Sequence, residues 1–475
     1  MSLTVVTRTG GQITLDSATL EAFQQPLRGP VLLPGAAGYD EARSIWNAMI
    51  DRKPALIVRC QGTADVIDAV NFARTHDLLL SVRGGGHNVT GNAVCEGGLM
   101  IDLSPMKGIH VDAKQRRVRA QGGATWGGVD RETQLFGLAT PGGVVSITGI
   151  AGLTLGGGLG WLRRKYGLAC DNLVSVEIVT ADGQLRTASM EENADLFWGI
   201  RGGGGNFGVV TSFAFQLHPV GPEVMLCNMM YPIEEAKTVI PAWRDFLASA
   251  PDDVSSICTF WSVPAVDPIP RALWNKQVVG IGAMYAGDPA EGEKLLQPLR
   301  ELAEPVLDMS GRIPYRTVQT LFDPFFPVGR RYFLKSTDLR SLDDEVIDAV
   351  LTRAGDRPTH ATLLVFWAYG GAINHVDVAD SAFASRAVPC MYSVDGVWDD
   401  PQDDERCIAW VREYIDFLKP YSSGGFYGNF AGDQEPGQKL YGPNHQRLVD
   451  LKNKYDPINL FHMNQNIKPT AQHGV

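Results

Sequence analysis

Three runs of glycine interrupt this chain, and the first is followed directly by a histidine. Residues 84–86 are all glycine, they come after the apolar run 78–82, and His87 and Asn88 come next. Successive backbone N–H groups in such a turn form a concave anion site that suits a pyrophosphate. A single histidine is usually a structural hydrogen-bonding residue, but here the imidazole would lie further along a bound dinucleotide.

The third glycine run contains a formal G-x-G-x-x-G motif at Gly203, Gly205 and Gly208. In a Rossmann unit this motif follows a strand, opens a helix and has an acidic residue about twenty positions further on. Glu223 meets the spacing, but the residues after the motif, VVTSFAFQL, alternate as a strand does. We therefore reject a nicotinamide-dinucleotide fingerprint and expect either a packed bulge or a turn that faces a cofactor.

Glycine is also the outlier of the overall composition. Of the 52 glycines among 475 residues, 28 fall between residues 81 and 210, which indicates tight turns or a close backbone approach there. The hydrophobic fraction of 44% and the charged fraction of 20% are typical of a globular protein. The length suits two or three domains.

Charge and cysteine content exclude several classes of protein. The 42 basic and 53 acidic residues give a net charge of −11 with no basic run, so we expect no nucleic-acid partner. Seven widely spaced cysteines without a C-x-x-C motif favour reduced thiols in a cytoplasmic protein over disulfides or a metal site. We find no signal peptide and no apolar run of about eighteen residues, so we also expect no membrane partner.

The elements that position the first glycine run form a strand–helix–strand unit. Residues 56–60 are a buried strand, 63–77 have helical periodicity, and 78–83 are a second apolar strand. Short alternating strands follow, and Asp182-Gly183 marks a hairpin between two of them.

After His218 the glycine density falls and a second pattern begins. Helices alternate with strands, which predicts a second α+β domain on an antiparallel sheet. The expected helices are 234–248, 289–302, 341–354 and 403–418, and the expected strands are 277–284, 361–369 and 424–430.

Several motifs in order resemble the flavin-binding half of the vanillyl-alcohol-oxidase (PCMH-type) family, within it the berberine-bridge-enzyme-like group. The resemblance is strong over roughly residues 55–220 and 424–469 and weak between them. The matching segments are RGGGHN at 83–88, IDLSPM at 101–106, the glycine-rich 139–172, 195–210, and the closing 448–467.

The resemblance implies an α+β fold with FAD as the cofactor. Residues 1–218 and 434–475 would form a two-part FAD-binding domain, and 219–433 an inserted substrate domain whose antiparallel sheet is covered by helices. His87 would be bonded through its ring to the flavin 8α-methyl carbon, since a neutral ring nitrogen is a competent nucleophile. The implied flavin contacts are Arg83, Gly84, Gly85, Gly86, His87, Asn88, Thr148, Gly149, Gly152, Gly158, Gly160, Tyr166, Gly167, Asn172, Ile178, Tyr427, Asn429, Asn464 and Asn466.

Two positions near the second glycine run bear on how the flavin is held and reoxidised. Many members add a second bond from a cysteine, and the matching position here is Val145. Cys170 is nearest but does not align, so we expect a small buried residue there and one covalent bond, through His87. Thr148 takes the place of the family's oxygen gate, and its small side chain favours an oxidase over a dehydrogenase.

The closing motif departs from the family where a base is expected. Alcohol-oxidising members carry Y-x-N-Y, and the second tyrosine is the base, but here residues 427–430 end in Phe430, which cannot accept a proton. If 424–430 is a strand, Tyr427 and Asn429 lie on one face and Phe430 on the other. A neutral amine can release a hydride without losing an O–H proton, so the phenylalanine is compatible with an amine substrate.

Neighbouring strands offer three candidate bases, Tyr369, His375 and Tyr392. A base must lie within hydrogen-bond reach of the substrate proton, and each candidate is more simply explained as a sheet tyrosine or a surface histidine. Trp367 and Phe430 suit a flat apolar substrate, although aromatic side chains in a sheet usually belong to the core.

The main hypothesis is an FAD-dependent oxidase acting on a small organic molecule. An alcohol, phenol, sugar or amine would give a hydride to flavin N5, and O₂ would reoxidise the flavin with release of H₂O₂. One alternative is a flavin dehydrogenase with another electron acceptor, which oxygen consumption would distinguish. The other is a flavin-binding protein whose catalysis has decayed, which anaerobic bleaching of the flavin by a substrate would exclude.

Overall fold

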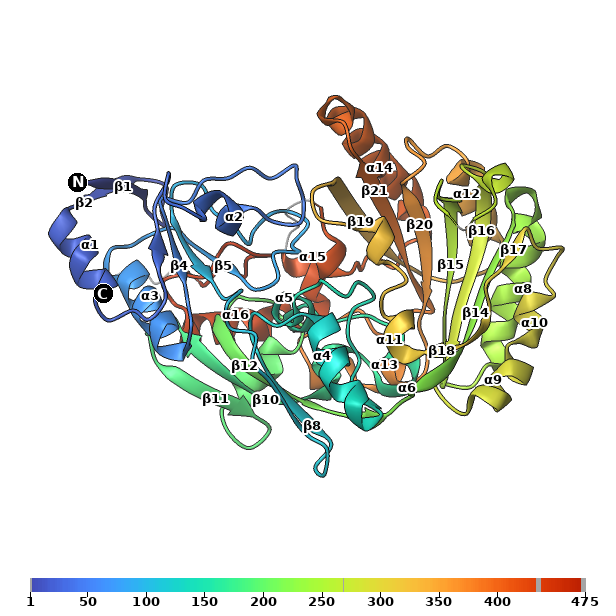
Figure 1. The fold of residues 1–475 in the computed structure, drawn as a ribbon, viewed down its shortest axis with the longest axis horizontal. Helices are drawn as coiled ribbons and strands as arrows, with labels where there is room; N and C mark the ends of the chain where they lie inside the picture. Colours follow the sequence, from blue (N-terminus) through green and yellow to red (C-terminus); the bar gives the residue numbers. More distant parts are fainter. Residues whose placement is uncertain (1, 268, 433–436, 471–475) are drawn as a thin grey trace.

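The first half of the chain contains a small, mostly parallel sheet that carries the first glycine turn (Figure 1). The computed structural model describes residues 2–267, 269–432 and 437–470. The α3 helix (Thr63–Thr75) connects β4 to β5, and both strands pair in parallel with β6, as the strand–helix–strand prediction requires. The strands, in sheet order, are β3 (Val31–Leu32), β4 (Leu56–Arg59), β6 (Leu99–Asp102) and β5 (Leu80–Arg83).

A five-stranded antiparallel sheet lies beside it. The hairpin predicted at Asp182-Gly183 joins β10 to β11, and Gly183 has a φ of +78°, which suits glycine. The strands, in sheet order, are β11 (Leu185–Ser189), β10 (Leu173–Thr180), β12 (Gly208–Gln216), β8 (Arg117–Gln121) and β7 (Ile109–Asp112). Two further pairs are β1 (Leu3–Val6) with β2 (Gln12–Leu15), and β9 (Leu138–Ala139) with β13 (His218–Pro219).

Helices from both ends of the chain complete this half. Leu196 of α7 shares a core with Leu448 and Leu451 of α16, so the C-terminal helices pack on the N-terminal sheets. The helices of this half are α1 (Ser17–Gln24), α2 (Tyr39–Arg43), α3, α4 (Trp126–Thr133), α5 (Ile150–Leu155), α6 (Arg163–Tyr166), α7 (Ala194–Ile200), α15 (Gly437–Tyr441) and α16 (His445–Tyr455).

The second half is built on one large antiparallel sheet, seen on the right of Figure 1. Its strands, in sheet order, are β17 (Leu307–Asp308), β14 (Glu223–Pro232), β16 (Gln277–Tyr285), β15 (Val254–Ser262), β20 (Leu363–Ala368), β21 (Cys390–Trp398) and β19 (Arg331–Leu339), while β18 (Gly311–Pro314) also pairs with β14. The two faces of this sheet have different neighbours because side chains alternate along each strand.

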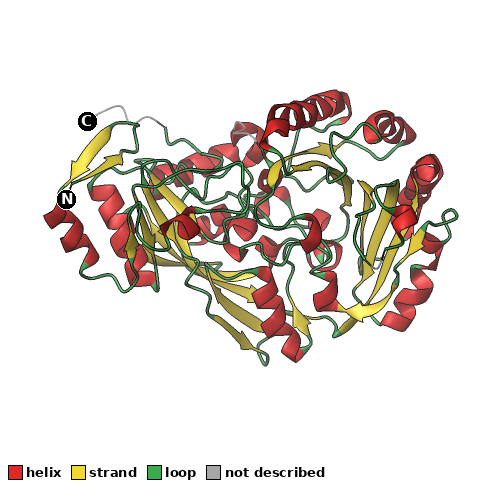
Figure 2. Cartoon of the chain, turned by 45° about the horizontal axis from the view of Figure 1, so that its top comes forward, coloured by secondary structure: helices red, strands yellow, loops and turns green. Residues whose placement is uncertain are grey.

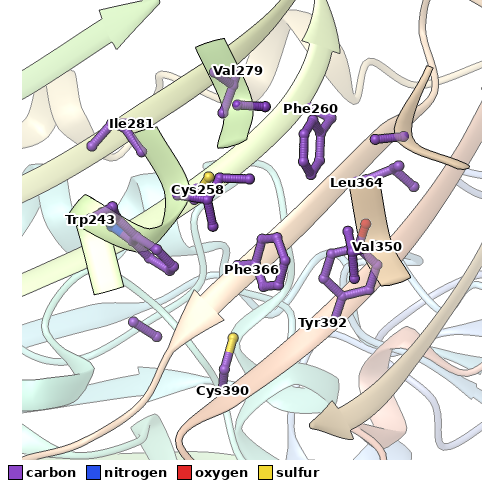
Figure 3. Close-up of a cluster of buried hydrophobic side chains, with 14 of the residues drawn as sticks. Trp243, Cys258, Phe260, Val279, Ile281, Val350, Leu364, Phe366, Cys390 and Tyr392 are labelled. Atoms are coloured by element: carbon purple, nitrogen blue, oxygen red, sulfur yellow. The ribbon is translucent and has the colours of Figure 1, made fainter. Parts of the chain in front are cut away.

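Helices cover one face of the large sheet, and the other face turns toward the first half (Figure 2). Trp243 of α8, Val350 of α12 and Tyr414 of α14 pack on the covered face, part of which Figure 3 shows. The helices of this half are α8 (Ala236–Ser249), α9 (Pro289–Leu295), α10 (Gln297–Arg300), α11 (Tyr315–Val318), α12 (Asp344–Ala354), α13 (Ala372–His375) and α14 (Asp404–Leu418). None of the helices in the described ranges has the length and apolar character needed to cross a bilayer.

Two local predictions are wrong. The helix expected over 289–302 is interrupted at Leu296, because Pro298 lacks the N–H that a continuous helix would use. Residues 424–430 form a loop and a 3₁₀ turn (Gly428–Phe430) instead of a strand. Gly424 has a φ of +93°, which breaks the extended path, and the segment is joined to β19 by an isolated bridge at Ser422 and by backbone hydrogen bonds of Ser423 and Gly425 with Asp338.

Candidate active site

The turn after β5 brings the first glycine run against the start of α5. A Cβ atom on Gly85 would lie 2.3 Å from the backbone nitrogen of Gly149, so neither backbone leaves room for a side chain. Gly86 has a φ of +71°, in the region that favours glycine. The turn therefore needs glycine for close approach and for conformation, and it presents bare backbone to a cavity.

This cavity lies between the glycine-rich half and the uncovered face of the large sheet. It brings together side chains from both halves that the sequence singles out separately. The predicted site residues that line it are Gly84, Gly85, Gly86, His87, Asn88, Thr148, Gly149, Gly152, Trp367, Tyr427, Asn429, Phe430 and Asn464.

His87 stands in the cavity wall with its Nε2 atom buried and without a hydrogen-bond partner in the described structure. The ring lies parallel to the indole of Trp46. Burial lowers the pKa of His87 to about 3, so the imidazole is neutral at physiological pH. A neutral imidazole keeps a nitrogen lone pair free for bonding.

Tyr427 and Asn429 tie the closing segment to the second glycine run. The Tyr427 hydroxyl accepts hydrogen bonds from the backbone N–H groups of Gly158 and Leu159, both at 3.1 Å. Asn429 donates to the same hydroxyl at 2.8 Å and to the Leu153 carbonyl at 3.0 Å. Burial raises the pKa of Tyr427 to about 12. The two residues lie together as predicted, but through a 3₁₀ turn.

Phe430 does not point away from them, as the strand prediction expects. Its ring meets that of Tyr427 edge to face, with centroids 5.1 Å apart, and both residues line the cavity. Trp367 lies 6.0 Å from Phe430 and 6.3 Å from Phe322 between ring centroids. Together with Phe326, these side chains give the sheet side of the cavity an aromatic wall.

Several predicted flavin contacts do not line the cavity but lie in the structure around it. Tyr166 stacks on His218 at 3.9 Å, and Asn172 donates to the Tyr166 and Leu168 carbonyls at 2.8 and 2.9 Å, so these residues shape the segment after the second glycine run. Cys170 is buried in the same core. The predicted contacts that do not line the cavity are Arg83, Gly158, Gly160, Tyr166, Gly167, Asn172, Ile178 and Asn466.

None of the three predicted bases lines the cavity. Tyr392 is on the helix-covered face, where its hydroxyl lies 3.2 Å from that of Tyr414 and its ring packs on Phe366 (Figure 3). Strand alternation thus directs Tyr392 away from the site. His375 is exposed at the end of α13. Tyr369 is buried on the cavity side of the sheet, and its hydroxyl has no partner in the described structure.

The structure adds Asp395, which the sequence reasoning missed. This residue of β21 lines the cavity and is only 2% exposed. Its Oδ2 accepts a hydrogen bond from the Ser393 hydroxyl at 3.2 Å, and its Oδ1 is buried without a partner among the described residues. Burial raises the pKa of Asp395 to about 7. The dipeptide Asp395-Gly396 reads as a turn signal, which hides the residue in the sequence.

The cavity fits a dinucleotide such as FAD. Cβ atoms on Gly152 and Gly205 would point into open space, so glycine keeps that part of the wall clear for a ligand. His87 Nε2 and Asn464 Oδ1 are buried polar atoms without partners in the described structure, and such atoms are normally satisfied. A ligand that approaches the bare glycine backbone and carries polar groups would supply the missing partners of both atoms.

Comparison with known proteins gives the same picture. The FAD binding domain family matches residues 54–189, and the berberine and berberine-like family matches residues 426–468. An FAD-linked oxidoreductase of Dictyostelium discoideum is 32% identical over 452 residues, which cover 94% of this chain and 96% of that protein. The (R)-6-hydroxynicotine oxidase of Paenarthrobacter nicotinovorans is 41% identical over 204 residues, 43% of this chain and 44% of that protein.

A solved structure extends the likeness over nearly the whole fold. The crystal structure of 6-hydroxy-D-nicotine oxidase from Arthrobacter nicotinovorans matches with a TM-score of 0.83 and 27% identity, covering 93% of this chain and 98% of that one. The glycine-lined cavity and these matches define a flavin-dependent oxidoreductase. The chain belongs to the FAD-linked oxidoreductases of the berberine-bridge-enzyme-like group, which confirms the predicted α+β class, the FAD cofactor and the enzymatic activity.

Proposed function

We propose that this protein is an oxidase that holds FAD through one covalent bond from His87 and oxidises a small alcohol, phenol, sugar or amine. O₂ would be the electron acceptor and H₂O₂ the product. The observation that carries the proposal is the neutral imidazole of His87, with a buried, unpartnered nitrogen at the cavity wall. Such a nitrogen can act as a nucleophile.

The same proposal assigns the domains and the groups that hold the cofactor. Residues 1–218 and 434–475 form the FAD domain, and 219–433 form the substrate domain. FAD, when bound, supplies a two-electron hydride acceptor. The backbone of 84–86 and the side chain of Asn464 would bind its polar groups. Val145 lines the cavity where related proteins carry a cysteine, which favours a single bond.

The aromatic wall supports a flat substrate in the remaining space. Trp367, Phe322 and Phe430 surround this part of the cavity, and Asp395 is the acidic side chain among them. One relative is by name a 6-hydroxynicotine oxidase, and a hydroxylated aromatic ring that carries an amine substituent suits such a wall. (R)-6-hydroxynicotine is therefore the first compound to test, followed by aromatic alcohols, other amines and sugars.

Acid precipitation tests the covalent bond. Purified wild-type protein should give a yellow pellet and, by mass spectrometry, a mass increase of one FAD. His87→Ala should lose both signals and still bind some flavin reversibly. His110→Ala is the matched control, because His110 is exposed on β7 and should leave the bond intact. A colourless wild-type pellet would refute the covalent bond.

Oxygen consumption separates the oxidase from a dehydrogenase. Stoichiometric H₂O₂ release during turnover supports the oxidase. Flavin that a substrate bleaches under nitrogen, but that air restores only very slowly, would support a different electron acceptor. We further propose a cytoplasmic location, because all seven cysteines are buried and unpaired, as in a reducing compartment.

A further inference from the structure

Asp395 is placed in the cavity by the alternation of β21. Tyr392 and Val394 belong to the core under the helices, whereas Asp395 lines the cavity on the opposite face of the strand. In the sheet register, Asp395 is paired with Leu334 of β19 and Leu363 of β20. The carboxyl therefore lies between two apolar neighbours, where an unpaired carboxylate is costly.

The hydrogen bonds around Asp395 leave one oxygen unused. Trp367 donates from Nε1 to the Ser393 hydroxyl at 3.0 Å, and this hydroxyl donates to Asp395 Oδ2 at 3.2 Å. Trp367 thus fixes the orientation of the Ser393 hydroxyl, and Ser393 fixes that of the carboxyl. Oδ1 remains buried with no partner in the described residues, in a cavity that is also lined by Trp367, Phe322 and Phe430. Because buried polar atoms are normally hydrogen-bonded, we expect a bound ligand to donate a hydrogen bond to Oδ1.

We propose that Asp395 is the catalytic base: it accepts the hydrogen bond, and then the proton, of the O–H or N–H group on the carbon that is oxidised. This inference rests on the proposed function and narrows its substrates to flat alcohols or amines with such a donor. It also explains how the reaction can proceed with Phe430 in the position of the family's tyrosine base, because a residue of another segment, β21, supplies the base.

The chemistry balances without a further group. In a substrate H–C–X–H, the C–H bond breaks and its electron pair leaves as hydride to the bound FAD. The X–H bond breaks and its proton passes to Asp395 Oδ1, so a C=X bond forms, where X is O or N. O₂ then takes up two electrons and two protons and leaves as H₂O₂, which restores Asp395 as a carboxylate.

Among the described residues, Asp395 is the acidic side chain that lines the cavity, whereas Asp338 of β19, whose pKa burial raises to about 6, lies behind Ser385 of the cavity wall. Burial raises the pKa of Asp395 to about 7, and the hydrogen bond from Ser393 acts in the opposite direction. Leu334 and Leu363 carry no charge. Across the cavity, the pKa of His87 is lowered to about 3 and that of Tyr427 is raised to about 12, so neither changes charge between pH 5 and 9. A base with a pKa near the working pH is well matched to proton transfer.

The flavin absorbance of the holoenzyme provides a test that needs no substrate. We expect the wild-type visible spectrum to titrate with a midpoint near pH 7 and D395N to lack this titration. S393A should shift the midpoint upward, because it removes the hydrogen bond that lowers the pKa. D130N is the matched control: Asp130 is equally buried with a pKa raised to about 7, but it does not line the cavity. A titration that persists in D395N, or is absent from wild type, overturns the proposal.

Anaerobic reduction provides the second test. Wild type and D395N are mixed with benzyl alcohol, benzylamine or 4-hydroxybenzyl alcohol, each of which carries an O–H or N–H group on the carbon that is oxidised, and flavin bleaching is followed. For any probe that reduces wild type, D395N should be slower by about 10²–10⁴-fold, with unchanged acid-stable flavin. Equal rates overturn the role of Asp395. A wild-type flavin that none of the three reduces counts against the proposed activity, whereas the spectral titration still judges Asp395 alone.

Discussion

The imidazole of His87 lies parallel to the indole of Trp46, with ring centroids 4.7 Å apart and an interplanar angle of 19°. Trp46 donates from Nε1 to the Phe326 carbonyl at 2.9 Å and stacks on Tyr332 at 3.7 Å. The indole comes from the N-terminal segment, whereas Phe326 and Tyr332 come from the second half of the chain. Contacts with both halves therefore fix the plane of the imidazole that faces the cavity.

This stacking makes Trp46 a positioning residue for flavin attachment. Trp46→Ala should lower the fraction of acid-stable flavin, because the imidazole loses a ring contact of about 0.5–1.5 kcal/mol and gains rotational freedom. Trp46→Phe should restore most of it. The measurement is flavin fluorescence in denaturing gels, normalised to protein.

Trp410→Phe is the control for this prediction, since Trp410 belongs to α14 and packs on the helix-covered face of the large sheet, away from the cavity. It should leave the attachment unchanged. If Trp46→Ala is as fully loaded as wild type, the stacked indole does not position His87.

The site around His87 could be predicted from the sequence, because the residues that form it are neighbours in the chain. An apolar strand, three glycines and the histidine follow one another within ten residues, and each has a direct conformational reason in the structure. Asp395 gives no such signal. Its burial depends on pairing with Leu334 and Leu363, which lie 61 and 32 positions away in the sequence (395 − 334 and 395 − 363). Only the assembled sheet shows that this acid faces a cavity.

The segment before Phe430 shows a different limit. Its alternating residue types favour a strand, but Gly425 packs so closely on β19 that a Cβ atom would lie 2.4 Å from Asp338 Oδ2. This contact and the positive φ of Gly424 replace regular pairing by a loop. The predicted neighbours Tyr427 and Asn429 still meet, because their mutual hydrogen bond forms within one turn.

Thr148 should control how fast O₂ reoxidises the flavin. It is half-buried in the cavity wall, so Thr148→Leu would add bulk where O₂ must approach. We expect reoxidation to slow roughly tenfold or more, equivalent to about 1.4 kcal/mol or more of barrier, while anaerobic reduction by substrate is unchanged. Stopped-flow absorbance measures both steps. Thr148→Val is nearly isosteric and should behave as wild type, and equal reoxidation by Thr148→Leu would contradict a gate at this position.

Buried acids should make the fold less stable as the pH rises. Burial raises the pKa of Asp130 and Asp395 to about 7 and that of Asp338 to about 6, against 3.8 for an ordinary aspartate. Between these values the folded state binds protons that the unfolded state has lost, so the contribution of these three acids to the unfolding free energy falls from about pH 4 to about pH 7. This fall exceeds the opposite contribution of two histidines, His87 and His218, whose pKa values are lowered to about 3 and about 4. Thermal unfolding should therefore occur at a lower temperature at pH 8 than at pH 5.

Asp130→Asn isolates one contribution to that fall. The amide stays neutral, so the variant should lose less stability than wild type between pH 5 and pH 8, with each pKa unit worth about 1.4 kcal/mol. Asp348→Asn, at an exposed position of α12, should follow the wild-type profile. Parallel profiles for Asp130→Asn and wild type would show that Asp130 titrates normally.

Two buried tyrosines on the cavity side of the large sheet should respond in opposite ways to loss of the hydroxyl. Tyr427→Phe leaves the N–H groups of Gly158 and Leu159 buried without their acceptor, and each such group costs about 1–3 kcal/mol. Chemical denaturation should show this loss, together with weaker flavin retention when His87 is also replaced by alanine.

Tyr369→Phe removes a buried hydroxyl that has no partner in the described structure, so its unfolding free energy should equal or exceed that of wild type. It should also keep wild-type activity, because Tyr369 does not line the cavity. Loss of activity in Tyr369→Phe, at unchanged stability, would return the catalytic base to Tyr369.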